Sequence, residues 1–253
     1  MNRIATAAVA IPLVVLITFF APHWIFALAA GLVAALAVEE FLSLTEKKGI
    51  GRPGRWFFVP AAGVVLSFVG GAGWVLASLA LAVIALMTVT IFSGPIETAL
   101  GRVVTGLAAI LYGPLTLGFL VLMPPGFILL LFAIIWIGDT AAYYAGRAIG
   151  RHPLAPEVSP KKTVEGAIAG LIGSVAVGAA GGVWFLDKPC LNVIGISAVT
   201  AVAGQLGDLA ESVLKRSAGV KDSSSILPGH GGILDRLDSL FFAAPVFYWF
   251  MKT

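Results

Sequence analysis

A group of polar residues between Asp208 and Asp238 carries the residue types that phosphoryl chemistry needs. Asp208 lies inside an apolar run, a Gly-His-Gly-Gly segment occupies residues 229–232, and Asp235 follows it closely. Mg²⁺ is commonly held by one or two carboxylates together with substrate phosphates, and glycines let a backbone approach a ligand closely. These residues therefore predict metal-assisted phosphoryl or nucleotidyl transfer, with Asp208 and Asp235 as candidate Mg²⁺ ligands.

Basic side chains are interleaved with these carboxylates. They are Lys215, Arg216, Lys221 and Arg236, and they would neutralise the charge of a polyphosphate. Asp208 and Lys215 are linked by steps of three and four residues, so they would share one face of a helix. Glu211 or Ser212 would lie between them on that face. A solvated loop whose charges pair with one another is the alternative, but it does not explain the glycines around His230.

A second motif at residues 138–150 places another carboxylate beside an apolar run. Asp139, Tyr143 and Arg147 recur at a spacing of four, which aligns them on one face of a helix. Asp139 follows the apolar residues 127–137, and a carboxylate in or near a membrane needs a cation, a metal ion or a proton. The alternative interpretation is that Asp139 and Arg147 pair with neighbouring helices.

Two adjacent lysines form the third candidate site. Lys161 and Lys162 follow Pro160, which breaks a preceding helix, and Ser159 or Thr163 would cap the helix that comes next. Ammonium groups beside the free N–H groups of a helix N-terminus suit a phosphate. The sequence does not indicate which lysine makes the contact. A lysine pair at a cytoplasmic membrane boundary is also a common topology anchor.

The elements that position these residues must be membrane helices, because the composition excludes a water-soluble fold. Hydrophobic residues make up 59% of the 253 residues, charged residues make up 11%, and the mean hydropathy is +1.00. Ordinary globular chains are about 45–50% apolar and about 25% charged. The same comparison excludes disorder, a coiled coil, a disulfide-rich secreted module and a nucleic-acid partner. We therefore expect an all-α, polytopic integral membrane protein.

Apolar runs separated by proline, glycine or charged residues predict about nine transmembrane helices. The predicted spans are residues 4–21, 24–44, 56–70, 74–92, 103–122, 127–146, 165–186, 190–214 and 239–251. The third and ninth are short, so their full crossing stays open. The first is interpreted as an uncleaved span, because no small-x-small cleavage site follows it.

The distribution of charge predicts both orientation and organisation. A cytoplasmic N-terminus places 14 of the 16 basic residues on the cytoplasmic side, with only Lys188 and Lys252 outside. Nine of the 13 acidic and nine of the 16 basic residues lie between Asp139 and Asp238. We therefore expect a scaffold of transmembrane helices at residues 1–126 and a catalytic region at residues 127–253, within one membrane domain.

Glycines in the seventh predicted span indicate close helix packing. Gly166 and Gly170 form one small-xxx-small pair, and Gly178 and Gly182 form another. Packing within the chain is the simpler interpretation, and a homodimer face is the alternative.

The segment from Ser212 to Asp238 resembles the signature of the phosphatidate cytidylyltransferase (CDP-diacylglycerol synthase) family. That signature runs Ser-x-hydrophobic-Lys-Arg, four residues, Lys-Asp, and then His-Gly-Gly-hydrophobic-x-Asp-Arg-hydrophobic-Asp, and this chain matches it without a mismatch. Residues 138–139 and 159–166 are similar to two upstream motifs of the family, with Val164 where an aromatic residue is common. The resemblance covers roughly residues 138–238, and the first half agrees only in being hydrophobic.

The resemblance implies that CTP and phosphatidate give CDP-diacylglycerol and pyrophosphate, with Mg²⁺ as cofactor. The phosphatidate phosphate would attack the α-phosphorus of CTP, and no strong base is needed because that phosphate is already ionised. The family motif assigns Asp208 and Asp235 to the metal site, and Lys162, Lys215 and Arg236 would balance phosphate charge. The remaining candidates for substrate binding are Asp139, Lys161, Ser212, Lys221, His230, Gly231, Gly232 and Asp238. The expected partners are CTP, phosphatidate and membrane lipids, and the expected location is a bacterial inner membrane with the site facing the cytoplasm.

Other functions would use some of the same residues. A CTP-dependent enzyme acting on a different lipid phosphate or on a lipid alcohol would show the same polar motifs. An ion transporter would also place Asp139 and Asp208 in the membrane, but transporters tend to show broken helices in two related halves. The Asp-Gly-x-x-Ala-Arg pattern of CDP-alcohol phosphotransferases and the P-loop motif are both absent from the sequence.

Overall fold

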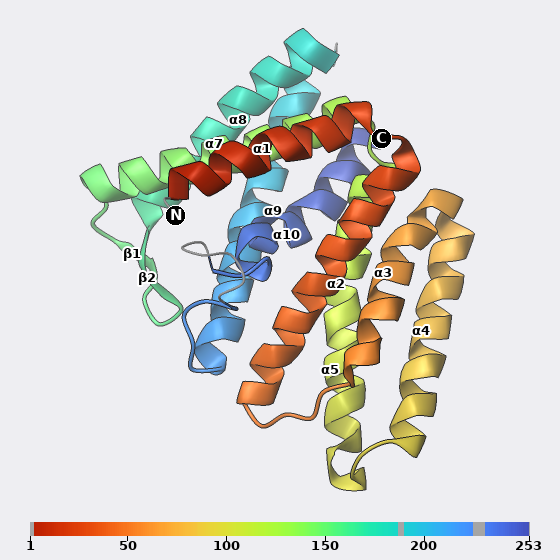
Figure 1. The fold of residues 1–253 in the computed structure, drawn as a ribbon. Helices are drawn as coiled ribbons and strands as arrows, with labels where there is room; N and C mark the ends of the chain where they lie inside the picture. The colour runs from red at the N-terminus through yellow and green to blue at the C-terminus, as the bar shows by residue number, and fades with distance from the viewer. Residues whose placement is uncertain (1–2, 187–189, 225–230, 253) are drawn as a thin grey trace. The chain divides into compact units, whose positions relative to one another are not determined.

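The computed structural model describes residues 3–186, 190–224 and 231–252, and most of them are helical (Figure 1). The helices are α1 (Arg3–Phe20), α2 (His23–Lys47), α3 (Phe58–Ser67), α4 (Ala72–Phe92), α5 (Ala99–Tyr112), α6 (Pro114–Gly118), α7 (Pro125–Ile149), α8 (Val164–Leu186), α9 (Cys190–Ser217) and α10 (Leu234–Lys252). Short 3-10 helices cover Arg55–Phe57, Phe68–Gly70, Ile96–Thr98 and Phe119–Leu122.

Within the described residues, six helical segments are long and apolar enough to cross a membrane. They are His23–Lys47, Ala72–Phe92, Ile96–Leu122, Pro125–Ile149, Val164–Trp184 and Cys190–Ser217. The apolar helical segment Arg55–Gly70 is shorter. The expectation of a helical integral membrane protein is therefore confirmed. The count of nine spans and the cytoplasmic N-terminus stay predictions.

A small β-hairpin between α7 and α8 departs from the all-α expectation. β1 (Pro153–Ala155) pairs antiparallel with β2 (Ser159–Thr163), and Pro153 lies opposite Thr163. The sequence shows no alternation of apolar and polar residues here, which is the usual signal for a strand. The hydrophobic pattern therefore did not predict the hairpin, although its two lysines were already candidate site residues.

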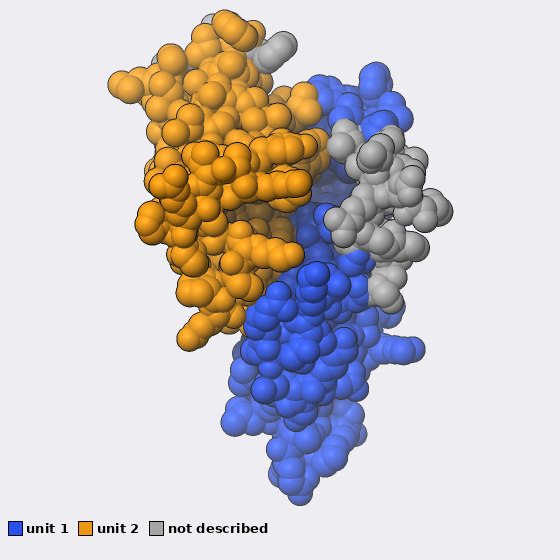
Figure 2. All heavy atoms as spheres, turned by 90° about the vertical axis from the view of Figure 1, so that its left-hand side faces the viewer, with its two compact units in different colours: residues 1–122, 214–237 blue, residues 123–213, 238–253 orange. Residues whose placement is uncertain are grey.

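The chain divides into two compact units, which Figure 2 shows in different colours. Unit 1 comprises Met1–Leu122 and Leu214–Leu237, and unit 2 comprises Met123–Val213 and Asp238–Thr253. The chain passes from one unit to the other between Leu122 and Met123, then within α9, and again within α10. The functional division into a scaffold and a catalytic region stays a prediction.

Unit 1 is built on neighbouring helices α2, α3, α4 and α5 (Figure 1). Its most deeply buried side chains include Phe57, Leu42 and Leu86. The Thr105 hydroxyl donates to the Gly51 carbonyl at 2.8 Å, which ties α5 to the segment that follows α2. Because lipid is as apolar as leucine, close packing and such hydrogen bonds hold membrane helices together.

Unit 2 is dominated by α7 and α8, which lie side by side (Figure 1). A Cβ atom on Gly166 would meet the carbonyl oxygen of Ala142 in α7, and one on Gly178 would meet the side chain of Ser197 in α9. These glycines of α8 therefore allow helices of the same chain to approach closely. This confirms packing within the chain as their role, while a homodimer stays a prediction.

Candidate active site

The hairpin is fixed to the start of α8 by side chains at the helix terminus. The Thr163 hydroxyl accepts a hydrogen bond from the Gly166 N–H at 3.1 Å, which is the capping role predicted for Ser159 or Thr163. The Glu165 carboxylate accepts from the Arg151 N–H at 3.0 Å and lies 2.6 Å from Nδ1 of His152. Both ends of the hairpin are therefore attached to α8.

The hairpin presents Lys162 to a carboxylate of α9. Lys162 Nζ lies 2.5 Å from Oδ2 of Asp208, and the two side chains are 28% and 31% exposed. Lys161 is exposed, because successive residues of a strand point to opposite faces. The structure thus distinguishes the two lysines that the sequence left equivalent, and it brings Lys162 to the predicted site residue Asp208.

Asp139 belongs to the same neighbourhood of unit 2. Its carboxylate interacts electrostatically with both Asp208 and Lys162. The three residues come from α7, β2 and α9, so unit 2 gathers two carboxylates and one ammonium group from three separate motifs. We call Asp139, Lys162 and Asp208 the open triad.

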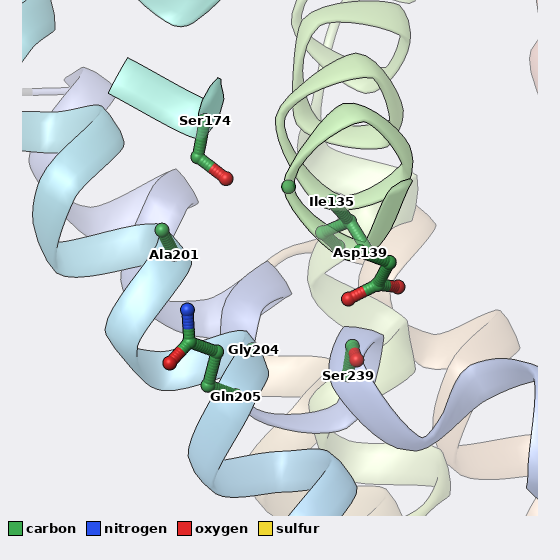
Figure 3. Close-up of a pocket in the computed structure, with 8 residues that line it drawn as sticks. Ile135, Asp139, Ser174, Ala201, Gly204, Gln205 and Ser239 are labelled. Carbon is green, nitrogen blue, oxygen red and sulfur yellow. The ribbon is translucent and has the colours of Figure 1, made fainter. Parts of the chain in front are cut away.

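A small pocket with several polar side chains in its lining adjoins Asp139. It is lined by Ile135, Gly138, Asp139, Ser174, Ala201, Gly204, Gln205 and Ser239, and Figure 3 shows the polar side chains around it. The Ser174 hydroxyl donates to the Ile134 carbonyl at 2.8 Å, and Gln205 Nε2 donates to the Ala167 carbonyl at 3.0 Å. Helix-to-helix hydrogen bonds of this kind keep polar groups satisfied at membrane depth.

Unit 1 contains a second lysine–aspartate pair with a different environment. Lys215 Nζ lies 2.5 Å from Oδ1 of Asp235, and the side chains are only 12% and 7% exposed. Oδ2 of Asp235 accepts from the N–H and the hydroxyl of Ser223, both at 2.9 Å, and from the Gly232 N–H at 2.7 Å. We call Lys215 and Asp235 the enclosed pair.

A carboxylate that the sequence interpretation overlooked lies beside the enclosed pair. Glu40 of α2 is 2% exposed and accepts hydrogen bonds from residues of the segment that precedes α10. Glu39 and Glu40 stand inside an otherwise apolar predicted span. An ionisable residue in such a run is a recognised sign of function, so a signal for Glu40 was present in the sequence.

The remaining predicted site residues differ in their burial and in their hydrogen-bond partners. Ser212 is buried in α9, and Asp238 Oδ1 accepts from the Ser239 N–H at 2.6 Å. Lys221 and Arg236 are exposed, and His230 lies outside the described residues. Arg216, which we expected to neutralise phosphate, is also exposed, and it donates to the Val220 carbonyl at 3.1 Å in the turn after α9.

The two glycines after His230 serve the protein's own packing in this structure. Gly231 has φ +79°, which disfavours other residues, and a Cβ atom on Gly232 would meet the side chains of Ser223 and Glu40. The absence of side chains here therefore lets carboxylates and hydroxyls of unit 1 close around the backbone. A contact between these glycines and a nucleotide stays a prediction.

The carboxylates suit Mg²⁺ in their chemistry. Among the described residues, no group of three or more His, Cys, Asp or Glu side chains could hold a metal ion by itself. Mg²⁺ needs only one or two carboxylates when phosphates supply the other oxygens. The ammonium group of Lys162 already lies against Asp208, so this carboxylate is placed to contact a cation. Asp208 belongs to unit 2 and Asp235 to unit 1.

The fold and the site define a polytopic helical membrane protein with acid–base pairs near its helix ends. Residues 1–253 match the family model described as Cytidylyltransferase family, and the chain belongs to this family. The chain is 48% identical over 125 residues to a phosphatidate cytidylyltransferase from Synechocystis sp., covering 49% of this chain and 42% of that protein.

Two further relatives carry the same name. The identity is 50% over 123 residues with a Staphylococcus aureus protein, covering 47% of this chain and 46% of that protein. It is 44% over 128 residues with a Haemophilus influenzae protein, covering 49% of this chain and 44% of that protein. The matched part of the chain thus spans less than half the length of these relatives.

Proposed function

We propose that the protein transfers a cytidylyl group from CTP to phosphatidate, giving CDP-diacylglycerol and pyrophosphate for phospholipid biosynthesis. Family membership and the names of its relatives support this proposal. The structural observation that carries it is the open triad, in which Asp139, Lys162 and Asp208 converge from three separate motifs. Opposite charges held together beside membrane helices suit the meeting of two anionic substrates.

The residues of this chain would act mainly by positioning and by balancing charge. Lys162 would leave Asp208 to contact a phosphate oxygen, since an ammonium group binds phosphate as readily as carboxylate. Lys215 and Arg236 would offset the charge of the departing pyrophosphate. The attacking phosphatidate oxygen is already ionised near neutral pH, so positioning contributes more than proton removal.

Asp208 and Asp235 are the proposed Mg²⁺ ligands, as the family resemblance implies. Asp139 would support Asp208 from α7 within unit 2. A bound Mg²⁺ ion would reduce the charge repulsion between the phosphates of the two substrates. We propose that the site faces the cytoplasm of a bacterial plasma membrane, where CTP is available, and that the N-terminus lies on the same side.

The activity is tested with the purified full chain in mixed micelles. Pyrophosphate should be released from CTP only when phosphatidate and Mg²⁺ are both present. Turnover with another lipid phosphate but not with phosphatidate would contradict the proposed substrate and retain the chemistry. Release that is independent of any lipid would contradict lipid cytidylylation altogether.

The orientation is tested separately with epitope tags in intact cells. A tag before Met1 should be inaccessible from outside, and a tag after Thr253 should be accessible, because nine spans place the two ends on opposite sides. Two tags with the same accessibility would show that the number of spans is even.

A further inference from the structure

The geometry points to Glu40 as a positioning residue for the segment that carries Asp235. This inference rests on the proposed function for its catalytic meaning, because Asp235 is a proposed Mg²⁺ ligand. Glu40 lies in α2, within the region predicted to be scaffold, and neither the sequence motifs nor the family resemblance assigns it a role. It nevertheless accepts four hydrogen bonds from described residues of unit 1.

Glu40 uses both carboxylate oxygens as acceptors. Oε1 accepts from the Ser224 hydroxyl at 2.6 Å and from the Ile233 N–H at 2.9 Å. Oε2 accepts from the Ser223 hydroxyl at 2.9 Å and from the Leu234 N–H at 2.7 Å. The side chain therefore joins both sides of the segment that separates α9 from α10.

Two of these bonds provide a cap for α10. The first N–H groups of a helix have no partner within the helix, and the helix dipole makes this end favourable for a negative charge. Ile233 precedes α10 and Leu234 is its first residue, so Glu40 supplies the acceptor that a local capping side chain would normally provide. The start of α10 is thereby fixed to α2.

The same cluster reaches Asp235 through a shared serine. The Ser223 hydroxyl lies 2.9 Å from Glu40 Oε2 and 2.9 Å from Asp235 Oδ2. Gly232 fits between the two carboxylates, because a Cβ atom there would meet Glu40 and Ser223. Glu40 therefore holds the backbone of residues 233–234 and, through Ser223, the orientation of the Asp235 carboxylate.

The decisive variant is Glu40→Gln, which keeps the shape but replaces one acceptor oxygen with an N–H₂ donor. The N–H₂ group would then face one backbone N–H, which can only donate, and one serine hydroxyl, which can rotate and accept instead. Glu39→Gln is the matched control, since Glu39 is the adjacent residue of α2 and pairs with Arg52 at 2.7 Å. Ser223→Ala is a milder second variant, which removes the link between Glu40 and Asp235 while leaving the cap on α10.

Two measurements are made on the full chain in micelles. The first is the apparent KM for CTP and for phosphatidate. In Glu40→Gln the KM for CTP should rise by about 10- to 100-fold, because loss of a residue that orients a metal ligand usually has an effect of this size. The KM for phosphatidate should be unchanged. A purely structural role would reduce the amount of active protein and leave both KM values unaltered.

The second measurement is amide hydrogen exchange in the peptide covering residues 231–238. Exchange should be faster in Glu40→Gln by at least about tenfold and unchanged in Glu39→Gln, because the cap restrains these amides. If Glu40→Gln does not fold, Ser223→Ala decides, with a smaller rise in the CTP KM. In Glu40→Gln, exchange or a CTP KM equal to that of the wild type would overturn the inference. In Ser223→Ala, which keeps the cap, an unchanged CTP KM would overturn it. Faster exchange in a chain whose wild type has no cytidylyltransferase activity would retain the positioning role and contradict only the proposed function.

Discussion

The two lysine–aspartate pairs have the same nitrogen-to-oxygen distance but very different surroundings. The Lys162–Asp208 pair of the open triad is partly exposed, while the Lys215–Asp235 pair is enclosed by Ser223 and Gly232. An exposed ion pair contributes little to stability and can exchange partners easily. A buried pair is costly to break, because one charge is left without its partner. The comparison suggests that the open pair exchanges partners more readily, and that the enclosed pair contributes more to stability in addition to its proposed role at the site.

Breaking the enclosed pair should have the largest combined effect on stability and activity. Asp235→Asn leaves the buried Lys215 ammonium without its carboxylate, so the free energy of unfolding should fall by about 3–5 kcal/mol. Activity should fall below detection. Thermal unfolding in micelles and the pyrophosphate assay measure the two effects, with the exposed residue Glu46→Gln as control. An unchanged unfolding midpoint would show that the pair is not enclosed in solution.

A substitution in the open triad should reduce activity strongly and change stability little. Asp208→Asn should reduce activity by at least about 100-fold, the usual loss for a group that stabilises transition-state charge. Its stability should change by no more than about 1 kcal/mol, because the pair is partly exposed. Glu157→Gln, an exposed carboxylate of the hairpin turn, is the control and should behave as the wild type. A stability loss as large as that of Asp235→Asn would remove the distinction between the two pairs.

The two adjacent lysines of β2 offer a sharper test of the site. Lys162→Met should reduce kcat/KM for CTP by about 10- to 100-fold, since a charged contact is worth roughly 1.5–3 kcal/mol. Lys161→Met, on the opposite face of the strand, should change it by less than about threefold. Steady-state kinetics measure both variants. Equal losses would mean that the hairpin does not orient the lysines as described.

The smallest effects should come from packing in unit 2. Gly178→Ala places a methyl group against Ser197 and should lower the free energy of unfolding by about 1–3 kcal/mol. Gly195→Ala is the matched control, because no atom lies within 4 Å of the added methyl group. It should leave stability unchanged or raise it slightly. Unfolding in micelles distinguishes the two, and equal midpoints would contradict the close approach of α8 and α9.

Features that depend on residues close in the sequence could be predicted well. The spacing of Asp208 and Lys215 indicated a helix, which α9 confirms, and Thr163 caps α8 as expected. The predicted span 239–251 corresponds to the later part of α10, which begins earlier, at Leu234. These features are determined by periodicity and by the chemistry of helix termini, both of which are local.

The contacts between distant segments could not be predicted in this way. Glu40 meets Ser223 across 183 positions of the chain, and no spacing rule connects them. The hairpin that separates Lys161 from Lys162 has only three and five residues in its strands, too few to show a pattern. The sequence therefore predicted which residues would carry the chemistry, but it did not indicate the contacts that Glu40 makes with the segment before α10.

The most direct test of the central claim determines whether the α-phosphorus or the γ-phosphorus of CTP enters the lipid. Purified protein is incubated with phosphatidate, Mg²⁺ and CTP labelled at either the α- or the γ-phosphorus, and the lipid fraction is counted. Cytidylyl transfer at the open triad predicts that the α-label enters the lipid, that the γ-label appears in pyrophosphate, and that Asp208→Asn abolishes both. Entry of the γ-label into lipid would show a CTP-dependent kinase instead, and full activity in Asp208→Asn would contradict the role of the open triad.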